Sequence, residues 1–294
     1  MTKPLTVGVD GSDGSLRALD WAVAEAARLG LPLHILHASL WDHYVRPAPR
    51  LAAVRPGQPA RDAAVVDNAR ERAARLGPGV PLSVQDVADD PFGALLRAAP
   101  EAYALVVGNR GRGELGDMLL GSVGLTVAGQ APCPVVVVRG RDANVSGRFG
   151  SVVLGVGGAD DAPDAARFAF RTARARGAGV EALHAWRSPE GGGDAGADRP
   201  AAERALDEAL RAARREHPEV AVRASAVEAK ARTPLLAASA AGDLLVVGAR
   251  RRVGAVGLHL GPVSHALLHH AECPVAVVPQ GAGVPAGEPA PAAS

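Results

Sequence analysis

The sequence predicts an α/β protein built from two tandem doubly wound domains, each a five-stranded parallel sheet with helices on both faces. The first observation is an internal repeat. Leu36-His37-Ala38 recurs 147 residues later as Leu183-His184-Ala185, and Cys133-Pro134-Val135 recurs 140 residues later as Cys273-Pro274-Val275. The second is a regular alternation of short apolar runs with segments whose apolar residues have helical spacing. The third is the length of 294 residues, which suits two domains of roughly 150 residues each.

The elements of the first copy follow from this alternation. Leu5–Val9 is a short apolar run, typical of a parallel strand buried on both faces. Ser12 and Asp13 then offer a helix N-cap, and apolar residues at helical spacing continue to Leu29, after which Gly30 ends the helix. The sequence further predicts, in order, a strand at 33–38, a long loop at 42–60, a helix at 61–76, a strand at 82–87, a short helix at 91–99, a strand at 104–107, a helix ending at Gln130 and a strand at 134–138.

The second copy repeats this order from Ser151 to Val278. We therefore predict a first domain at residues 1–140, a linker at 141–150, a second domain at 151–280 and a disordered tail at 281–294. The tail lacks enough apolar side chains to pack against either domain. Residues 188–200, which are rich in glycine and charged side chains, are predicted to be mobile.

Composition and charge exclude several classes of function. Lys+Arg 32 against Asp+Glu 31 leave a net charge of +1, so no strong basic field is available to bind a nucleic acid. Aromatic residues make up 3%, too few for a platform on which single-stranded bases stack. The chain opens on a strand pattern rather than a signal peptide, and its apolar runs are far shorter than the roughly 18 residues of a membrane span. The sequence therefore predicts a cytoplasmic protein that binds neither nucleic acid nor membrane.

The cysteines and the paired histidines have structural interpretations. Cys133 and Cys273 occupy one duplicated position, so we expect buried packing residues rather than a disulfide, a zinc site or reactive thiols. His37 and His184 end matching strands and are expected to hydrogen-bond to backbone. Three further histidines on one predicted helix are interpreted as a solvated face rather than a metal site: His265, His269 and His270.

A glycine-rich turn follows the predicted fourth strand. Gly108, Gly111 and Gly121-Ser122 form the pattern G-x2-G-x9-G-S, with Ser122 at the start of the next helix. Glycines let a backbone approach an anion closely, and a helix N-terminus favours phosphate oxygens. Asp10, after the first strand, can accept hydrogen bonds from ribose hydroxyls or help hold a metal on phosphates. The chain contains no G-x-x-x-x-G-K-[ST] P-loop, so the predicted phosphate site is of another kind.

This glycine pattern, together with Val9-Asp10-Gly11-Ser12 and the strand after Cys133-Pro134, resembles the universal stress protein family. The resemblance covers nearly the whole chain twice and so implies a tandem member. It implies a regulatory stress-response module with an adenine-nucleotide site, usually for ATP, with or without Mg²⁺. Asp10 would face the ribose and triphosphate, and Ala38 would meet the adenine through its backbone. The implied site residues are Gly8, Asp10, Ala38, Gly108, Asn109, Arg110, Gly111, Arg112, Gly113, Gly121, Ser122 and Val123.

The second copy departs from this pattern at three positions. Gly157 stands where the first copy has Asp10, which removes the carboxylate. Arg251 stands at the position of Gly111, and Pro262 replaces Ser122, which deletes a hydroxyl and a backbone N–H donor. We therefore predict one competent nucleotide site, in the first domain. The basic run Arg250-Arg251-Arg252 is interpreted as a solvated turn, with an anion clamp as the alternative.

Two other functions stay open. A nucleotide-independent scaffold would pair through the last strand of each sheet, because edge strands invite pairing. Family members commonly pair in this way, which implies a homodimer or an intramolecular pseudo-dimer. An adenylating or nucleotide-hydrolysing enzyme of related architecture would need a catalytic lysine or an H-x-G-H turn, and neither follows the first strand. The sequence thus predicts a binding module with no assigned catalytic residue and at most slow ATP hydrolysis.

Overall fold

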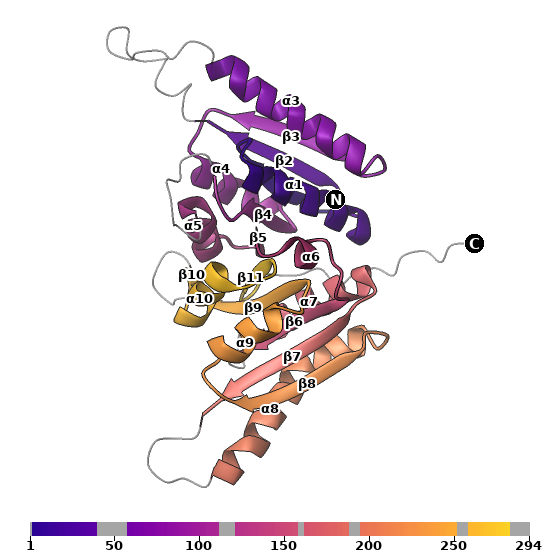
Figure 1. The fold of residues 1–294 in the computed structure, drawn as a ribbon, viewed down its shortest axis with the longest axis vertical. Helices are drawn as coiled ribbons and strands as arrows, with labels where there is room; N and C mark the ends of the chain where they lie inside the picture. Colours follow the sequence, from indigo (N-terminus) through magenta and orange to yellow (C-terminus); the bar gives the residue numbers. More distant parts are fainter. Residues whose placement is uncertain are drawn as a thin grey trace, which may run out of the picture.

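The computed structural model describes residues 2–39, 58–111, 121–157, 162–187, 195–251 and 258–282 (Figure 1). The first half of the chain contains, in order, β1 (Leu5–Val9), α1 (Asp13–Leu29), β2 (Leu33–Ala38), α3 (Gln58–Leu76), β3 (Leu82–Val87), α4 (Pro91–Ala98), a 3₁₀ turn (Ala99–Glu101), β4 (Ala104–Gly108), α5 (Ser122–Gln130) and β5 (Val135–Val138). The second half contains β6 (Ser151–Val156), α7 (Ala162–Arg176), β7 (Gly179–Trp186), α8 (Ala195–Glu216), β8 (Val222–Glu228), α9 (Arg232–Ser239), β9 (Leu244–Arg251), β10 (Leu258–His259), α10 (Pro262–His270) and β11 (Val275–Pro279). A short helix, α6 (Asp142–Val145), lies between the halves.

The predicted α/β class is confirmed. Within each half the five main strands pair in parallel, in the orders β3-β2-β1-β4-β5 and β11-β9-β6-β7-β8. The first helix forms as its sequence predicts. Ser12 caps α1 by accepting a hydrogen bond from the Ser15 N–H, and Gly30 ends it with a left-handed φ of 64°.

Helices cover both faces of the sheet and bury two separate cores. One core contains residues of α1, α3, α7 and α8, and the other contains residues of α4, α5, α9 and α10. β5 contributes to both because successive side chains of a strand point to opposite faces: Val136 and Val138 lie in the first core, Val135 and Val137 in the second. Among the described residues, no helix combines the length and the apolar character needed to cross a membrane.

Two predicted boundaries are wrong. α3 begins at Gln58, so residues 58–60 are helical rather than loop, and the rest of the predicted loop, 42–57, lies outside the described residues. α8 includes residues 195–200, which were expected to be mobile, whereas residues 188–194 lie outside the described part. Ala202, Leu206 and Leu210 are buried at a spacing of four and anchor α8. The helix extends from them back to Ala195, through Gly196 and Pro200, both of which are unfavourable in a helix interior and favoured the expectation of a loop.

The predicted tail begins in contact with the second half of the chain. The Gly281 N–H donates a hydrogen bond to the Asp164 carboxylate (2.8 Å). Residues 283–294 lie outside the described residues.

The two halves share one continuous sheet. β5 and β11 pair antiparallel, with Val135 opposite Val277 and Val137 opposite Val275, and they meet in the middle of the molecule (Figure 1). This pairing within one chain corresponds to the expected intramolecular pseudo-dimer, and a homodimer of two chains stays a prediction. The outer strands of the sheet are β3 and β8, so the last strands are not its edges.

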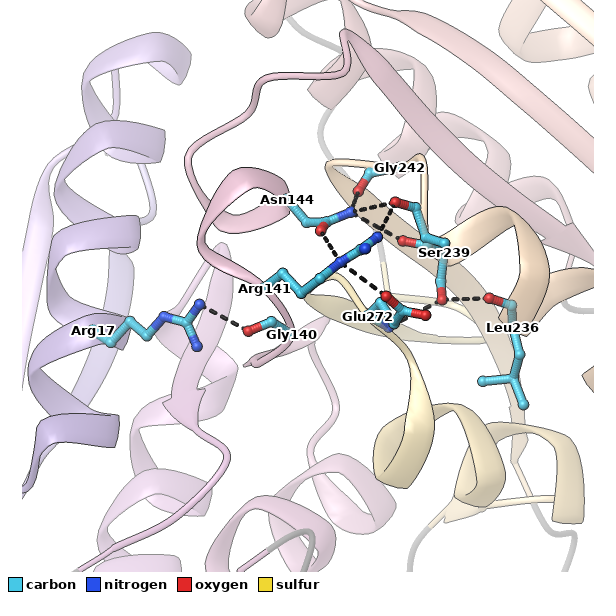
Figure 2. Close-up of polar contacts among 9 residues, drawn as sticks. Arg17, Gly140, Arg141, Asn144, Leu236, Ser239, Gly242 and Glu272 are labelled. Carbon is cyan, nitrogen blue, oxygen red and sulfur yellow. Dashed lines mark hydrogen bonds and ion pairs between the residues drawn. The ribbon is translucent and has the colours of Figure 1, made fainter.

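The segment between the halves is held from both sides by polar contacts (Figure 2). From the first half, Arg17 of α1 donates to the Gly140 carbonyl (2.8 Å) and forms an ion pair with Asp142 (2.7 Å). From the second half, Arg141 forms an ion pair with Glu272 (2.8 Å). The predicted linker is therefore a structured connection.

Asn144 is the buried centre of this connection. Its side-chain amide nitrogen lies within hydrogen-bonding distance of three carbonyl oxygens after α9, those of Ser239 (3.2 Å), Ala240 (3.1 Å) and Gly242 (2.8 Å). Asn144 is 0% exposed, and its side-chain oxygen accepts a hydrogen bond from Arg141. These contacts satisfy carbonyls that the end of α9 leaves without intrahelical partners.

Candidate functional site

A cavity of about 400 Å³ opens at the carboxyl ends of β1, β2 and β4. In doubly wound sheets ligands bind at this edge, where the strand order changes direction. The apolar part of the wall comes from β2, α4 and the ends of β1 and β4: Leu36, Ala38, Pro91, Leu95, Val9 and Val107. The polar part comes from the turn after β1, the first turn of α1, the turn after β4 and the start of α5: Asp10, Ser15, Arg110, Gly111, Gly121 and Ser122.

Close backbone contacts explain the glycines beside this cavity. A Cβ on Gly108 would lie 2.5 Å from the Gly14 carbonyl oxygen, and a Cβ on Gly14 would lie 2.5 Å from the Arg110 carbonyl oxygen. The turn after β4 therefore rests directly on the start of α1. A Cβ on Gly111 would lie 2.8 Å from the Asp10 carboxylate, so the glycine-rich turn packs against the acidic side chain after β1.

Asp10 is held in place by the residues that start α1. One carboxylate oxygen accepts hydrogen bonds from the Ser12 N–H (3.0 Å) and the Ser12 hydroxyl (2.6 Å). The Asp10 N–H in turn donates to the Ser15 hydroxyl (3.3 Å). The carboxylate is therefore fixed at the cavity wall while remaining partly accessible.

The start of α5 supplies backbone donors to the cavity. Gly121 is the N-cap of α5 and makes no side-chain cap, whereas Ser12 caps α1 with its hydroxyl. Ser122 and Val123, in the first turn of α5, line the cavity, so their N–H groups lie at the positive end of the helix dipole. The Gly121 N–H itself donates to the Asn109 carbonyl (2.7 Å), which ties the turn after β4 to this helix.

Nine of the twelve expected site residues line this cavity: Gly8, Asp10, Ala38, Gly108, Arg110, Gly111, Gly121, Ser122 and Val123. Asn109 lies in the same turn, but its contribution is the backbone carbonyl that Gly121 contacts. Arg112 and Gly113 lie outside the described residues. Seven lining residues were not among those expected from the sequence: Val9, Ser15, Leu36, Pro91, Leu95, Val107 and Gly124. Pro91 and Leu95 have the i,i+4 spacing of one helix face, which could have identified them as a wall.

The second half has a smaller cavity, of about 260 Å³, at the corresponding edge. Gly157 lies in its wall at the position of Asp10, and Pro262 is the first residue of α10, where a proline is compatible with the helix. β9 continues to Arg251 and pairs with β10, whereas β4 already ends at Gly108. The backbone that forms a glycine-rich turn in the first half is thus extended strand in the second; the side chain of Arg251 lies outside the described part.

The other singled-out residues are consistent with structural roles. His37 Nδ1 lies 2.7 Å from the Val9 carbonyl oxygen and His184 Nδ1 lies 3.0 Å from that of Val156, which confirms the expected backbone hydrogen bonds. Cys133 and Cys273 are buried free thiols, and burial raises the pKa of each to about 12. Thiols with such pKa values are poor nucleophiles.

The histidines of α10 stack on one another. The ring centroids of His265 and His269 lie 4.5 Å apart, and burial, followed by the charges of its histidine neighbours, lowers the pKa of His269. Within the described residues no group of three or more histidine, cysteine, aspartate or glutamate side chains could hold a metal ion.

Comparisons with known proteins agree with this architecture. The model of the universal stress protein family matches residues 1–139 and again residues 148–279. Universal stress protein Rv2005c of Mycobacterium tuberculosis is 34% identical over 296 residues, covering 95% of this chain and 100% of that protein. Universal stress protein Rv2623 of the same organism is 30% identical, covering 93% of this chain and 95% of that protein. A solved universal stress protein from Archaeoglobus fulgidus has the same fold, with a TM-score of 0.71 at 18% identity, covering 96% of this chain and 100% of that chain. The chain belongs to the universal stress protein family, as a member with two copies of the family unit.

Proposed function

We propose that the chain is a regulatory stress-response module that binds ATP in the cavity of its first half. The observation that carries the proposal is the composition of that cavity, which joins an apolar end to an end rich in glycine and backbone donors. Its volume of about 400 Å³ falls in the range of roughly 300–1,000 Å³ of small-molecule and cofactor sites.

The apolar end suits an adenine ring. Leu36 and Ala38 of β2 face it from the sheet, and Pro91 and Leu95 of α4 close it from above the strand ends. A flat, largely apolar base gains free energy by leaving water for such walls. Hydrogen bonds to the edge of the base would come from backbone groups near Ala38, as the family resemblance implies.

The opposite end suits the ribose and phosphates. Gly108 and Gly111 leave the backbone open to a close approach, and Ser122 adds a hydroxyl to the N–H groups of the first turn of α5. Asp10 supplies the carboxylate for ribose hydroxyls or for Mg²⁺ on the phosphates. Arg110 lines the same end and can contact phosphate oxygens.

We further propose one competent nucleotide site and the domain division 1–140, 141–150, 151–280 and 281–294. The second cavity has glycine in place of the carboxylate, proline in place of Ser122 and extended strand in place of the glycine-rich turn. These three changes remove groups that an ATP site in the first half would use. Binding rather than rapid catalysis is proposed because the described wall of the cavity contains neither a histidine nor a lysine that could serve as a catalytic base.

The direct test is mass spectrometry of the small molecules released when freshly purified full-length protein is denatured, followed by ATP titration in a calorimeter. We expect co-purified adenine nucleotide or saturable ATP binding with one site per chain. Absence of both at millimolar ATP would overturn the proposal, and two equivalent sites would overturn its one-site form.

The nucleotide-independent scaffold remains the second candidate because β5 and β11 pair as a dimerisation element would. Light scattering of the full chain with and without ATP separates the two functions. A molecular mass that is the same with and without ATP, together with no ATP binding in the calorimetric titration, would favour the scaffold.

A further inference from the structure

We propose that Leu260, in the second half of the chain, is a positioning residue for the nucleotide site of the first half. It acts by supporting α5, the helix whose first turn forms the phosphate end of the first cavity. This inference rests on the proposed function. It gives the second half a part in nucleotide binding although its own cavity has glycine in place of Asp10 and proline in place of Ser122.

The start of α5 is part of the wall of the first cavity. Gly121, the N-cap of the helix, lines the cavity together with Ser122, Val123 and Gly124. A backbone N–H binds a phosphate oxygen only when the nitrogen lies about 3 Å from the oxygen and the N–H points at it. The affinity for phosphate groups therefore depends on the position and tilt of α5.

The side chains of α5 anchor it only weakly. The helix is nine residues long and two of these are glycine, whereas helices shorter than about 12–15 residues are already marginal in water and glycine weakens them further. Its buried residues are Gly124, Val127 and Ala128. At the last two of these positions α10 buries the larger Leu267 and Leu268. The position of α5 therefore depends strongly on the elements that pack around it.

One of these elements belongs to the second half. α5 packs against α4 and β5 of the first half and against β10 of the second half, which lies beside it (Figure 1). β10 reaches this place as part of an antiparallel pair with the end of β9, in which Leu258 lies opposite Arg251. The extension of β9 that distinguishes the second half from the first thus brings a segment of the second half against α5.

Leu260, which follows β10, fits against Gly129 of α5. It is partly buried and packs against the core that contains α5 residues. A Cβ on Gly129 would lie 3.3 Å from Leu260 Cδ1, which is shorter than the roughly 3.5–4.0 Å of an ordinary contact between carbon atoms. The leucine therefore lies close to the helix backbone at a position where a side chain would push it away. α10 has His269 at the position of Gly129, so the close approach matches a feature of α5.

The test compares calorimetric titrations of the full-length protein and its Leu260→Ala variant with ATP and with adenosine, which has the base and ribose but no phosphate. We expect Leu260→Ala to weaken ATP binding about fivefold or more and adenosine binding less than about twofold. Leu260→Met, which nearly conserves the volume, should bind ATP as the parent does. Leu236→Ala is the matched control, because Leu236 is another partly buried leucine of the second half but belongs to α9, which packs against α10 and strands of its own half. Equal weakening of ATP and adenosine, or equal effects of the two alanine variants, would overturn the proposal.

Hydrogen exchange of residues 121–130 without ligand tests the support of α5 independently of ATP. Leu260→Ala should speed this exchange roughly threefold or more, because the helix opens more easily without the contact. Gly129→Val should do the same by displacing Leu260, and combining it with Leu260→Ala should restore part of the protection, since the new side chain then has room. Unchanged exchange in Leu260→Ala would overturn the proposal. If the parent binds no ATP, the proposed function fails, and the exchange of α5 still decides whether Leu260 supports the helix.

Discussion

Glu25 of α1 and Arg176 of α7 form an ion pair across the boundary between the two halves, with 2.9 Å between Oε2 and Nη2. The side chains are 3% and 5% exposed, so both charges lie out of reach of bulk water. Arg176 also lies over the ring of Trp21, 5.4 Å from its centroid. A charge buried in this way is tolerated only with its partner, which makes the docking of the halves specific.

Arg176→Gln should therefore destabilise the protein by about 3–5 kcal/mol, because it leaves the Glu25 carboxylate buried without its main cation. The measurement is the urea midpoint of unfolding followed by circular dichroism. Arg28→Gln is the matched control. Arg28 contacts the same carboxylate at 3.4 Å but is 36% exposed, so we expect a loss under about 1 kcal/mol. Equal losses for the two variants would contradict a special role for the buried pair.

Asn144 should be the most sensitive residue of the connection between the halves. Asn144→Asp places a carboxylate against the carbonyl oxygens of Ser239, Ala240 and Gly242, where the amide now donates. We expect a loss of about 3 kcal/mol or more and faster proteolysis within residues 139–150. Ser146→Ala, at the exposed end of the same helix, should leave both unchanged. An Asn144→Asp protein as protease-resistant as the parent would show that α6 does not hold the halves together.

Gly108→Ala should weaken ATP binding at least tenfold, because the new Cβ would lie 2.5 Å from the Gly14 carbonyl oxygen and displace the turn after β4. Gly79→Ala is the matched control. It makes the same change in the turn between α3 and β3, where a Cβ meets nothing within 4 Å. Calorimetric titration of both variants checks the prediction, which fails if Gly108→Ala binds ATP as the parent does.

Positions 111 and 251 correspond in the two copies, and exchanging their residues should affect ATP binding in the first half only. Gly111→Arg should abolish ATP binding, since even a Cβ at this position would lie 2.8 Å from the Asp10 carboxylate. Arg251→Gly should not create a second ATP site, because Gly157 and Pro262 remain. The number of ATP molecules bound per chain is the readout. A second site in Arg251→Gly would show that this arginine alone blocks the second half.

ATP should protect only the first half against hydrogen exchange. A ligand that binds only the native state adds RT ln(1 + [L]/Kd), about 2.7 kcal/mol at a hundredfold excess over Kd. We expect protection at residues 9–12, 108–111 and 121–123, which surround the first cavity. The matching residues 156–157, 248–250 and 261–263 should change little. Equal protection in both halves would make the one-site proposal wrong.

The protein should lose stability at alkaline pH because of its two buried cysteines. Burial raises the pKa of Cys133 and Cys273 to about 12, whereas an unfolded thiol has a pKa of about 8.5. Below about pH 8.5 each thiol is protonated in both the folded and the unfolded chain, so the folded state keeps its full stability. Between about pH 8.5 and 12 only the unfolded chain releases it, and stability falls by up to about 1.4 kcal/mol per thiol for each pH unit. Urea midpoints measured across this window check the trend, and a Cys133→Ala, Cys273→Ala protein should show a shallower decline.

Most of the local structure follows from short stretches of the sequence. The strands at 5–9, 33–38 and 82–87 begin and end as predicted. The first two are short, mostly apolar runs, as a buried parallel strand requires. The third is an outer strand in which apolar and polar residues alternate for most of its length. The cap at Ser12 and the end at Gly30 depend on the backbone of a few neighbouring residues. The glycine-rich turn could also be predicted from the sequence, because its close packing requires residues without a Cβ at fixed positions.

The way in which the halves join, and the walls that close each cavity, depend on contacts between distant segments. Asn144 and Arg176 resemble surface residues in the sequence, but their side chains are buried because partners about 95 and 151 residues away contact them. Pro91 and Leu95 share one face of α4, but they line the first cavity because α4 packs against β1 and β2, which lie far from it in the sequence. The extension of β9 beyond Gly248 likewise depends on pairing with β10. Local sequence fixes backbone conformation through short-range sterics and hydrogen bonds, whereas burial of polar groups depends on contacts between distant segments that form only when the chain has folded.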